Sequence, residues 1–237
     1  MQPPQSPVIV ATGLERRFGS VVALRSVAIS VSAGEVVLLA GPNGAGKSTL
    51  LRTLAGLARP THGTVEVQGI SLRNRPEGRG AIGFLSHQNF LYDDLTAREN
   101  LRFAATLHGL SSVEQRVMDS LHAAGLAQRA DIRTAVLSHG MRQRLAIARA
   151  TLHDPALLLL DEPFSGLDAA SVEQLRGGLA AGAGRGRAVI CVTHQPADLW
   201  QIATRVVFLD RGAIVLDTPR HRTLEEFHAA CARSVAA

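Results

Sequence analysis

Hydrophobic positions either alternate with polar ones or form short continuous runs along most of the chain. The strand-like runs are Val8–Thr12, Val21–Ser32, Glu35–Ala40, Thr64–Gln68, Ala81–Leu85, Ala156–Asp161, Ala188–Thr193, Arg205–Leu209 and Ala213–Leu216. Helical periodicity appears from Lys47 to about Ala58, around Ala170–Ala181, in a short stretch after Thr193, and in a last helix capped by Thr223 and Glu226. Strands that alternate with helices predict an α/β protein with a parallel sheet.

Residues 96–152 depart from this alternation and predict helix almost throughout. Thr96 with Glu99, and Ser112 with Gln115, each have the spacing of a capping box, in which two side chains satisfy the free N–H groups of a helix start. Ser138 opens a third helix that runs to about His153. We expect a single domain over residues 1–237, with an α/β core (1–88 and 154–237) and an inserted helical subdomain (89–153).

A glycine-rich segment between a predicted strand and a predicted helix matches the pattern G-x-x-x-x-G-K-[ST]. It consists of Gly41, Pro42, Asn43, Gly44, Ala45, Gly46, Lys47, Ser48 and Thr49. Glycines let the backbone wrap a phosphate, whose charge is met by N–H groups and by the helix N-terminus. Lys47 brings a compact cation to the phosphates, and Ser48 supplies a hard oxygen for Mg²⁺. The segment therefore predicts nucleotide binding.

Acidic side chains follow the apolar run 157–160. Asp161 comes at the carboxyl end of a buried strand, where it can hold Mg²⁺, and Glu162 follows, where it can activate a water molecule. His194 ends the next predicted strand along the chain. Carboxyl ends of parallel strands open on one crevice, so we expect His194 to contact the γ-phosphate there.

Composition narrows the function classes. The chain has 237 residues and a formal net charge of +5, and Lys47 is the only lysine among its 25 basic residues. Apolar runs reach five residues, against about 20 for a membrane span, and Met1–Pro7 lacks a basic apolar leader. Cys191 and Cys231 form no disulfide framework. The arginines are scattered and only 4% of residues are aromatic, so we expect no nucleic-acid partner.

Further motifs follow in an order that resembles the ATP-binding subunits of ABC transporters. Leu137-Ser138-His139-Gly140-Met141 is similar to the family's signature, usually Leu-Ser-Gly-Gly-Gln, and differs from it at His139 and Met141. Gln88 falls at the Q-loop position, and residues 165–168, ending in Asp168, resemble the D-loop. Phe18 lies where the family stacks an aromatic ring on adenine.

The resemblance implies a P-loop NTPase (RecA-like) core with a small antiparallel β region and the inserted all-helical subdomain. It implies that ATP and Mg²⁺ are bound, with Ser48, Gln88 and Asp161 at the metal and Glu162, Gln88 and His194 as catalytic residues. In the family, Ser138 and Gly140 of one subunit close over the ATP of another, which implies a homodimer. The chain would then be a peripheral subunit that works with integral membrane subunits at the cytoplasmic face of the inner membrane.

Residues 91–103 and the Ser-x-Gly-Met form of the signature are similar to one branch of the family, the ATPases of heme export in bacterial cytochrome c maturation. ATPases that export drugs, polysaccharides or lipids have similar motifs, so they are the alternative. Two other classes remain, a non-transport ABC ATPase acting on nucleic acid or ribosomes, and a small P-loop kinase. The first class usually carries two cassettes, a long coiled coil or a basic tail, and none of these features is found in this sequence. The second class lacks the signature that this sequence has.

Overall fold

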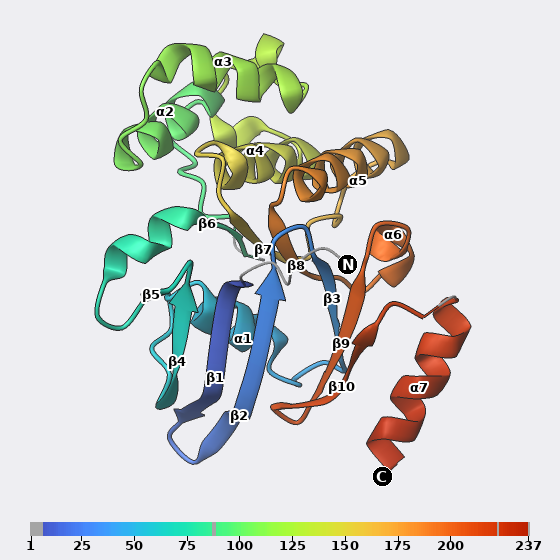
Figure 1. Ribbon diagram of the computed structural model, residues 1–237. Coiled ribbons are helices and arrows are strands. Elements are labelled where there is room, and N and C mark those ends of the chain that lie inside the picture. The colour runs from blue at the N-terminus through green and yellow to red at the C-terminus, as the bar shows by residue number, and fades with distance from the viewer. Residues whose placement is uncertain (1–6, 87–88, 222, 237) are drawn as a thin grey trace.

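The computed structural model describes residues 7–86, 89–221 and 223–236. Its centre is a six-stranded sheet with the order β10-β9-β3-β8-β7-β6 (Figure 1). The strands are β3 (Val36–Ala40), β6 (Ile82–Leu85), β7 (Leu157–Asp161), β8 (Ala188–Val192), β9 (Arg205–Asp210) and β10 (Ala213–Pro219). All neighbours are parallel except β9 and β10. Every residue of β3, β7 and β8 is buried, because helices or a second sheet cover both faces.

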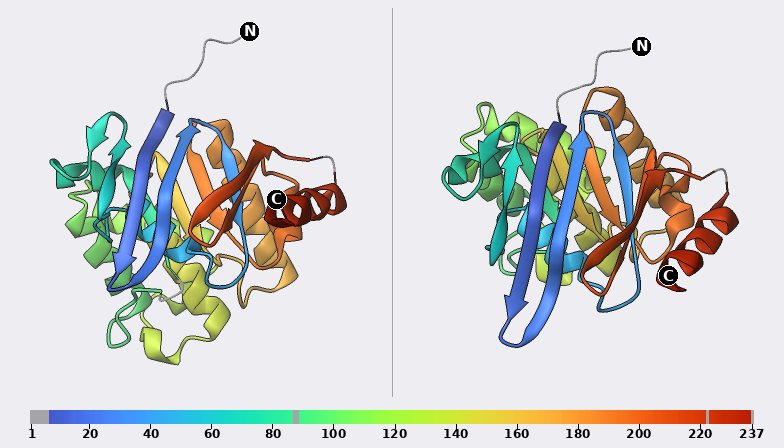
Figure 2. Two further views of the ribbon diagram at one scale, coloured as in Figure 1. Left: turned by 90° about the horizontal axis from the view of Figure 1, so that it is seen from below. Right: turned by 60° about the horizontal axis from the view of Figure 1, so that its bottom comes forward.

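A second sheet is antiparallel, with the order β2-β1-β4-β5. Its strands are β1 (Pro7–Phe18), β2 (Val21–Ser32), β4 (His62–Val67) and β5 (Ile70–Ser71), and a 3₁₀ turn, η1 (Pro76–Ala81), follows. The long β1–β2 hairpin crosses in front of the six-stranded sheet (Figure 2). Helix α1 (Lys47–Leu54) packs its buried face, Leu50, Leu51 and Leu54, into the core shared by the two sheets.

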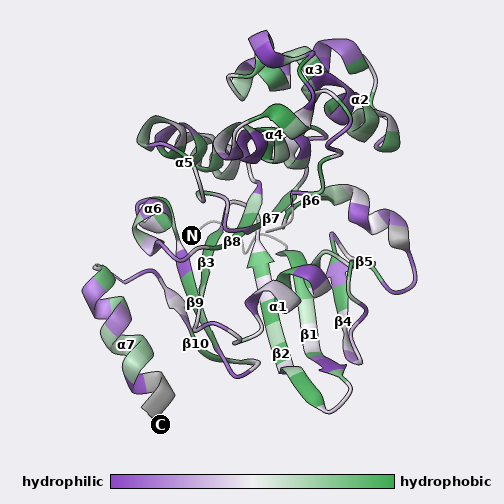
Figure 3. Cartoon of the chain, turned by 180° about the vertical axis from the view of Figure 1, so that it is seen from behind, coloured by the Kyte–Doolittle hydropathy of each residue, from purple (hydrophilic) through white to green (hydrophobic). Residues whose placement is uncertain are grey.

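The other face of the six-stranded sheet is covered by helices. Besides α4 (His139–Thr151), these are α5 (Ala169–Gly184), α6 (Pro196–Trp200) and α7 (Leu224–Ala236). Trp200 and Phe227 pack together in this layer, with ring centroids 5.6 Å apart. Figure 3 shows hydrophobic colouring concentrated in the strands and hydrophilic colouring on the outer helices.

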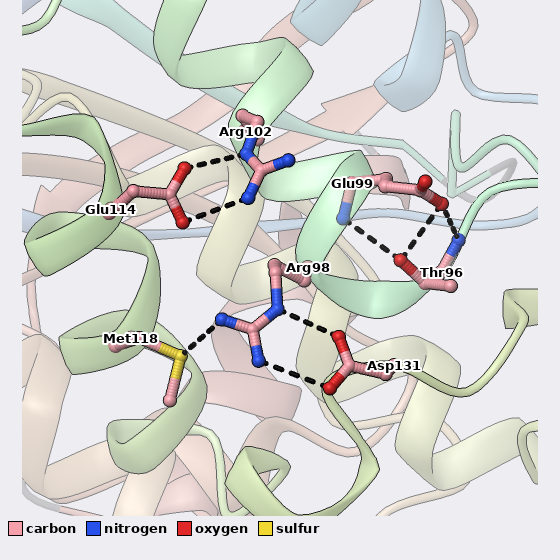
Figure 4. Close-up of polar contacts among 7 residues, drawn as sticks. All are labelled: Thr96, Arg98, Glu99, Arg102, Glu114, Met118 and Asp131. Atoms are coloured by element: carbon pink, nitrogen blue, oxygen red, sulfur yellow. Dashed lines mark hydrogen bonds and ion pairs between the residues drawn. The ribbon is translucent and has the colours of Figure 1, made fainter.

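Helices α2 (Ala97–Leu107), α3 (Val113–Ala123) and α4 form the helical region, which has its own small apolar core. The short 3₁₀ turns η2 (Ala127–Arg129) and η3 (Thr134–Val136) connect α3 to α4. On its surface Arg98 forms a two-bond ion pair with Asp131, and Arg102 does the same with Glu114 (Figure 4). These exposed pairs contribute little to stability, so the apolar core holds the helices together.

The α/β class, the antiparallel β region and the all-helical insertion are as predicted. The capping boxes at Thr96 and Thr223 are present, and Ser138 caps α4 by accepting a hydrogen bond from the N–H of Met141. The prediction of a capping box at Ser112 is wrong. Ser112 has a φ of 52°, a left-handed conformation in which its side chain makes no cap hydrogen bond, and the Gln115 amide binds Asp119 instead.

Some boundaries also differ from expectation. Strand β1 extends from Pro7 to Phe18 because β2 and β4 flank it on both sides. Helix α1 ends at Leu54, four residues before the predicted end, and α5 continues to Gly184, three residues beyond the predicted Ala181. Within the described residues, no helix is long and apolar enough to cross a membrane.

Candidate functional site

A cleft of about 1220 Å³ opens at the carboxyl ends of the central strands. The loop after β3, the residues after β7 and the residues after β8 all line it, together with the start of β2. Strand β3 pairs with β8, and β8 with β7, so three separate chain segments end side by side. The structure thus brings Lys47, Ser48, Asp161, Glu162 and His194 into one cleft.

The glycine-rich loop is shaped by close backbone contacts that exclude side chains. A Cβ on Gly41 would lie 2.1 Å from the carbonyl oxygen of Leu209, and one on Gly46 would lie 2.5 Å from that of Ala23. Gly46 has a φ of 103°, which an L residue rarely adopts. The Lys47 ammonium donates hydrogen bonds to the carbonyls of Gly41 (2.7 Å) and Pro42 (2.9 Å), which hold it across the loop.

Helix α1 begins in this cleft without a side-chain cap. In contrast, the side chains of Thr96, Ser138 and Asp168 cap α2, α4 and α5. The first N–H groups of a helix have no partner inside it, and their partial positive charge attracts anions. The uncapped α1 is therefore free to direct these groups at a phosphate.

Asp161 and Ser48 line the same cleft from different elements. Asp161 is the last residue of β7 and is buried. A carboxylate and a hydroxyl are hard oxygen donors of the kind Mg²⁺ takes when substrate phosphates complete its coordination. The donor set fits Mg²⁺, and these two residues are the ones that would hold it.

Glu162 is held in a strained position beside Asp161. Its φ is 55°, and its N–H donates to the carbonyl of Val192 at 2.9 Å. One carboxylate oxygen, Oε2, accepts from the backbone N–H of His194 at 3.1 Å, while the buried Oε1 has no hydrogen-bond partner within the described chain. Burial raises the pKa of Glu162, although the His194 contact and Lys47 oppose the shift. A carboxylate with a raised pKa is a stronger base.

His194 and Lys47 flank this carboxylate. The His194 ring nitrogen Nε2 lies 3.5 Å from Glu162 Oε1, and the imidazole is largely exposed to the cleft. Burial lowers the pKa of the Lys47 ammonium, and the nearby carboxylates of Glu162 and Asp161 oppose that shift. The site therefore combines a carboxylate base, an exposed imidazole and an ammonium held by two carbonyls.

Gln143 is a site residue that motif reasoning missed. It lies on α4, is buried, and donates from Nε2 to the carbonyls of Glu162 and Pro163, both at 3.0 Å. These bonds tie the helical region to the backbone of Glu162. A buried glutamine on a helix face was the available signal, because such an amide needs hydrogen-bond partners.

The signature residues lie outside the cleft of their own chain. Neither Ser138 nor Gly140 lines it. The His139 ring packs against Gly166, since a Cβ on Gly166 would lie 2.0 Å from Cδ2 of His139. The residue that departs from the usual glycine thus fits against the segment 165–168 of the same chain.

Three other predicted site residues are placed as follows. Phe18 ends β1 at the tip of the hairpin and is 51% exposed, with the Arg16 guanidinium 4.5 Å from its ring centroid. It does not line the cleft, but Val21 across the turn does. Asp168 caps α5 through the N–H of Ser171 and also lies outside the cleft. Gln88 is outside the described residues.

Comparisons with known proteins agree with this geometry. The profile of the family described as ABC transporter matches residues 24–165. The chain is 40% identical to the cytochrome c biogenesis ATP-binding export protein CcmA of Bordetella bronchiseptica, over 87% of this chain and 91% of that protein. It is 36% identical to the glutamate transport ATP-binding protein GluA of Corynebacterium glutamicum, over 89% of this chain and 90% of that protein.

A solved structure is also similar. The dimeric post-hydrolysis state of the ATP-binding cassette MJ0796, bound to ADP and Pi, superposes with a TM-score of 0.82 and 28% sequence identity. The superposition covers 91% of this chain and 100% of that one. The arrangement of sheets and helices is thus shared with a nucleotide-binding cassette.

Proposed function

Because the chain belongs to the ABC transporter family, we propose that it is the subunit that binds MgATP and hydrolyses it to drive heme export through separate membrane subunits. The observation that carries the hydrolytic role is the cleft itself. It joins an uncapped helix start, the cation of Lys47 and the carboxylate pair Asp161 and Glu162. Each of these groups has a distinct task in phosphoryl transfer to water.

Phosphate binding uses the loop and the start of α1. The N–H groups of residues 43–48 surround the phosphates, and the Lys47 ammonium moves from the carbonyls of Gly41 and Pro42 toward the β- and γ-phosphates. Ser48 and Asp161 would hold Mg²⁺, which would supply neutralising charge to the phosphate oxygens.

Hydrolysis then needs a base beside the γ-phosphate. Glu162 Oε1, which accepts no hydrogen bond within the described residues, accepts a proton from the attacking water. The water oxygen forms the new bond to phosphorus as the bond to the β-phosphate oxygen breaks. His194 donates a hydrogen bond to a γ-phosphate oxygen, and its backbone N–H keeps Glu162 in place. Gln88 completes the proposed catalytic set.

Two copies are needed to complete this site. Ser138 and Gly140 lie at the start of α4 and do not line the cleft of their own chain. A second copy arranged head to tail supplies these residues to the γ-phosphate, while Phe18 stacks on adenine and Asp168 lies at the junction between the copies. The likeness to a dimeric cassette supports this arrangement.

Heme as the cargo rests on similarity alone. The chain shares 40% identity with an export protein of cytochrome c biogenesis, but 36% with a glutamate transport protein. Another ABC exporter, for drugs, polysaccharides or lipids, is the alternative. The place of action under either reading is the cytoplasmic face of the inner membrane. Deleting the gene in its source organism tests the cargo, because only heme export predicts loss of c-type cytochromes on a heme-stained gel.

The substitution Glu162→Gln tests the hydrolytic mechanism. It keeps the shape and removes the base, so we expect ATP binding to persist and turnover to fall by at least 100-fold. We also expect the ATP-loaded variant to elute as a dimer in size-exclusion chromatography.

The matched control is Glu66→Gln, an exposed carboxylate on β4 away from the cleft. It should leave turnover unchanged. A Glu162→Gln variant that hydrolyses ATP normally contradicts the assignment of the base, and a monomer at saturating ATP contradicts the shared site.

A further inference from the structure

Helix α4 contacts the base segment, residues 162–166, at two points on one helix face. Gln143 donates a hydrogen bond to the Glu162 carbonyl at 3.0 Å. His139 lies four residues earlier on α4, so it shares the face of Gln143, and its ring packs against Gly166. The helix therefore meets the base segment at its first residue and again at its last.

The contact between His139 and Gly166 leaves no room for a side chain at position 166. A Cβ there would lie 2.0 Å from Cδ2 of the imidazole and 2.6 Å from Nε2. The backbone of Gly166 has a φ of 73°, which L residues rarely adopt. Gly140 is close to the same residue, since a Cβ on it would lie 2.8 Å from the Gly166 carbonyl oxygen. The imidazole thus fills the space that any side chain at position 166 would need.

The base segment is short and closed by its own hydrogen bonds. The N–H of Ser165 donates to the Glu162 carbonyl at 3.3 Å, and the N–H of Leu167 donates to the Phe164 carbonyl at 3.2 Å. Phe164 is buried in the apolar layer over the six-stranded sheet. Close-packed segments transmit a displacement instead of absorbing it. A shift at one end of this segment therefore reaches the other end.

The His139 side chain has no other contact that accounts for it. It is exposed, and it makes no hydrogen bond or ion pair with any described residue. Gly166 lines the nucleotide cleft, whereas His139 does not. A histidine here, where the ABC signature usually has glycine, thus acts on the site through the wall of the cleft.

We propose that His139 is a positioning residue, whose ring holds Gly166 against the start of α4 and, together with Gln143, sets the place of Glu162 relative to that helix. The inference rests on the proposed function, because it concerns the base of that hydrolysis. Helix α4 begins at the signature residues that are proposed to meet a second copy. When the second copy moves this helix, the two contacts pass the movement to the carboxylate of the same chain.

A double-mutant cycle on ATP turnover tests the pair. Gly166→Ala places a methyl group where the ring lies, so we expect kcat to fall at least tenfold, because a misplaced base loses rate steeply. In the His139→Ala background the space is open, and the same change should lower kcat by less than threefold. Backbone strain at position 166 is present in both backgrounds, so the difference reports the contact itself.

A second glycine controls for backbone strain. Gly109 has a φ of 63°, and nothing lies within 4 Å of a Cβ built on it. It follows α2 and does not line the cleft. Gly109→Ala should therefore leave kcat unchanged.

Substitutions of His139 separate ring packing from proton chemistry. His139→Ala should lower kcat three- to tenfold, while the dissociation constant for a fluorescent ATP analogue stays within twofold, because the glycine-rich loop is untouched. His139→Phe keeps a planar ring and should retain at least half of the wild-type kcat from pH 6 to pH 8. Turnover is normalised to the number of ATP-binding sites, so unfolded protein does not contribute. His122→Ala, on an exposed histidine of α3 away from the cleft, is the matched control.

Several outcomes overturn the proposal. They are a Gly166→Ala variant with wild-type kcat, equal effects of Gly166→Ala in the two backgrounds, a His139→Ala variant with unchanged kcat, and a His139→Phe variant as slow as His139→Ala. If Gly166→Ala fails to fold, the double variant must fold for the proposal to stand.

The wild-type chain separates the two possible failures. If it hydrolyses MgATP while the cycle is additive, the positioning role of His139 alone is wrong. If it does not hydrolyse MgATP, the proposed function is wrong, and the positioning role is wrong with it.

Discussion

The six-stranded sheet and the helical region position their functional groups by different means. Asp161, Glu162 and His194 end or follow neighbouring strands whose backbone hydrogen bonds set their spacing. Ser138 and His139 instead lie at the start of α4, whose neighbours α2 and α3 meet it through a small side-chain core and exposed ion pairs. Gln143 links the two regions through the Glu162 and Pro163 carbonyls.

This difference matches the tasks of the two regions. A site that breaks a phosphate bond needs fixed geometry, which paired strands provide. The signature residues, which are proposed to meet a second copy of the chain, share one helix, and a helix can shift as a unit at lower cost. The following changes test the contrast, from the largest expected effect to the smallest.

The substitution Lys47→Arg tests how strictly the cleft at the carboxyl ends of the strands requires a compact cation. The two carbonyls at 2.7 and 2.9 Å hold a compact ammonium, and a planar guanidinium is too broad for the same cradle. We expect ATP turnover to fall by at least 100-fold at unchanged net charge. The control Arg59→Lys, on an exposed arginine outside the cleft, should be neutral. Normal turnover in Lys47→Arg shows that the position of the only lysine has no chemical cause.

Core truncations compare the two apolar interiors. Leu158 of β7 and Leu121 of α3 are both fully buried. We expect Leu158→Ala to reduce the free energy of unfolding by roughly 3–5 kcal/mol, since a strand paired on both sides cannot collapse into the cavity. Leu121→Ala should cost about 2–3 kcal/mol, because a helix near the surface can relax. Urea unfolding measures both values, and equal costs contradict the contrast.

The smallest expected effect is the pH dependence of stability caused by His153, which lies between the six-stranded sheet and the helical region. Its pKa is lowered from 6.5 to about 4, chiefly by burial, so between these values the unfolded chain binds a proton that the folded chain does not. The contribution of His153 to stability is therefore largest above pH 7 and declines as the pH falls toward 4. Allowing for solvent screening of this partly exposed ring, the loss attributable to His153 is roughly 1–2 kcal/mol.

The variant His153→Gln checks this pH effect. It removes the titrating group, so its free energy of unfolding should fall less between pH 7.5 and pH 5 than that of the wild-type chain. Chemical denaturation at the two pH values provides the comparison. If the free energy of unfolding falls by the same amount in both proteins, groups other than His153 cause the pH dependence.

Local patterns predicted much of the molecule because local physics determines them. The apolar runs of β3, β7 and β8 and the caps at Thr96 and Ser138 depend on neighbouring residues alone. Ser112 shows the limit of that reasoning. It has the residue types of a capping box, but the turn from α2 into α3 places it in a left-handed conformation that its own sequence does not reveal.

The candidate site was predicted unevenly for the same reason. The loop 41–49 and the pair Asp161 and Glu162 are short motifs whose chemistry can be recognised in the sequence. No role was predicted for Gln143, because its role depends on the carbonyls of Glu162 and Pro163, about twenty residues away in the chain.

The sequence by itself determined which residues can hold a phosphate and a metal, where most strands and helices lie, and where the only lysine is placed. Tertiary structure alone decided that β8 lies between β3 and β7, which brings His194 and Glu162 to Lys47. It also decided that Arg149 is half-buried beside Phe90, with no hydrogen-bond partner for its Nε among the described residues. Strand order and desolvation arise from contacts between distant segments, so no local pattern encodes them.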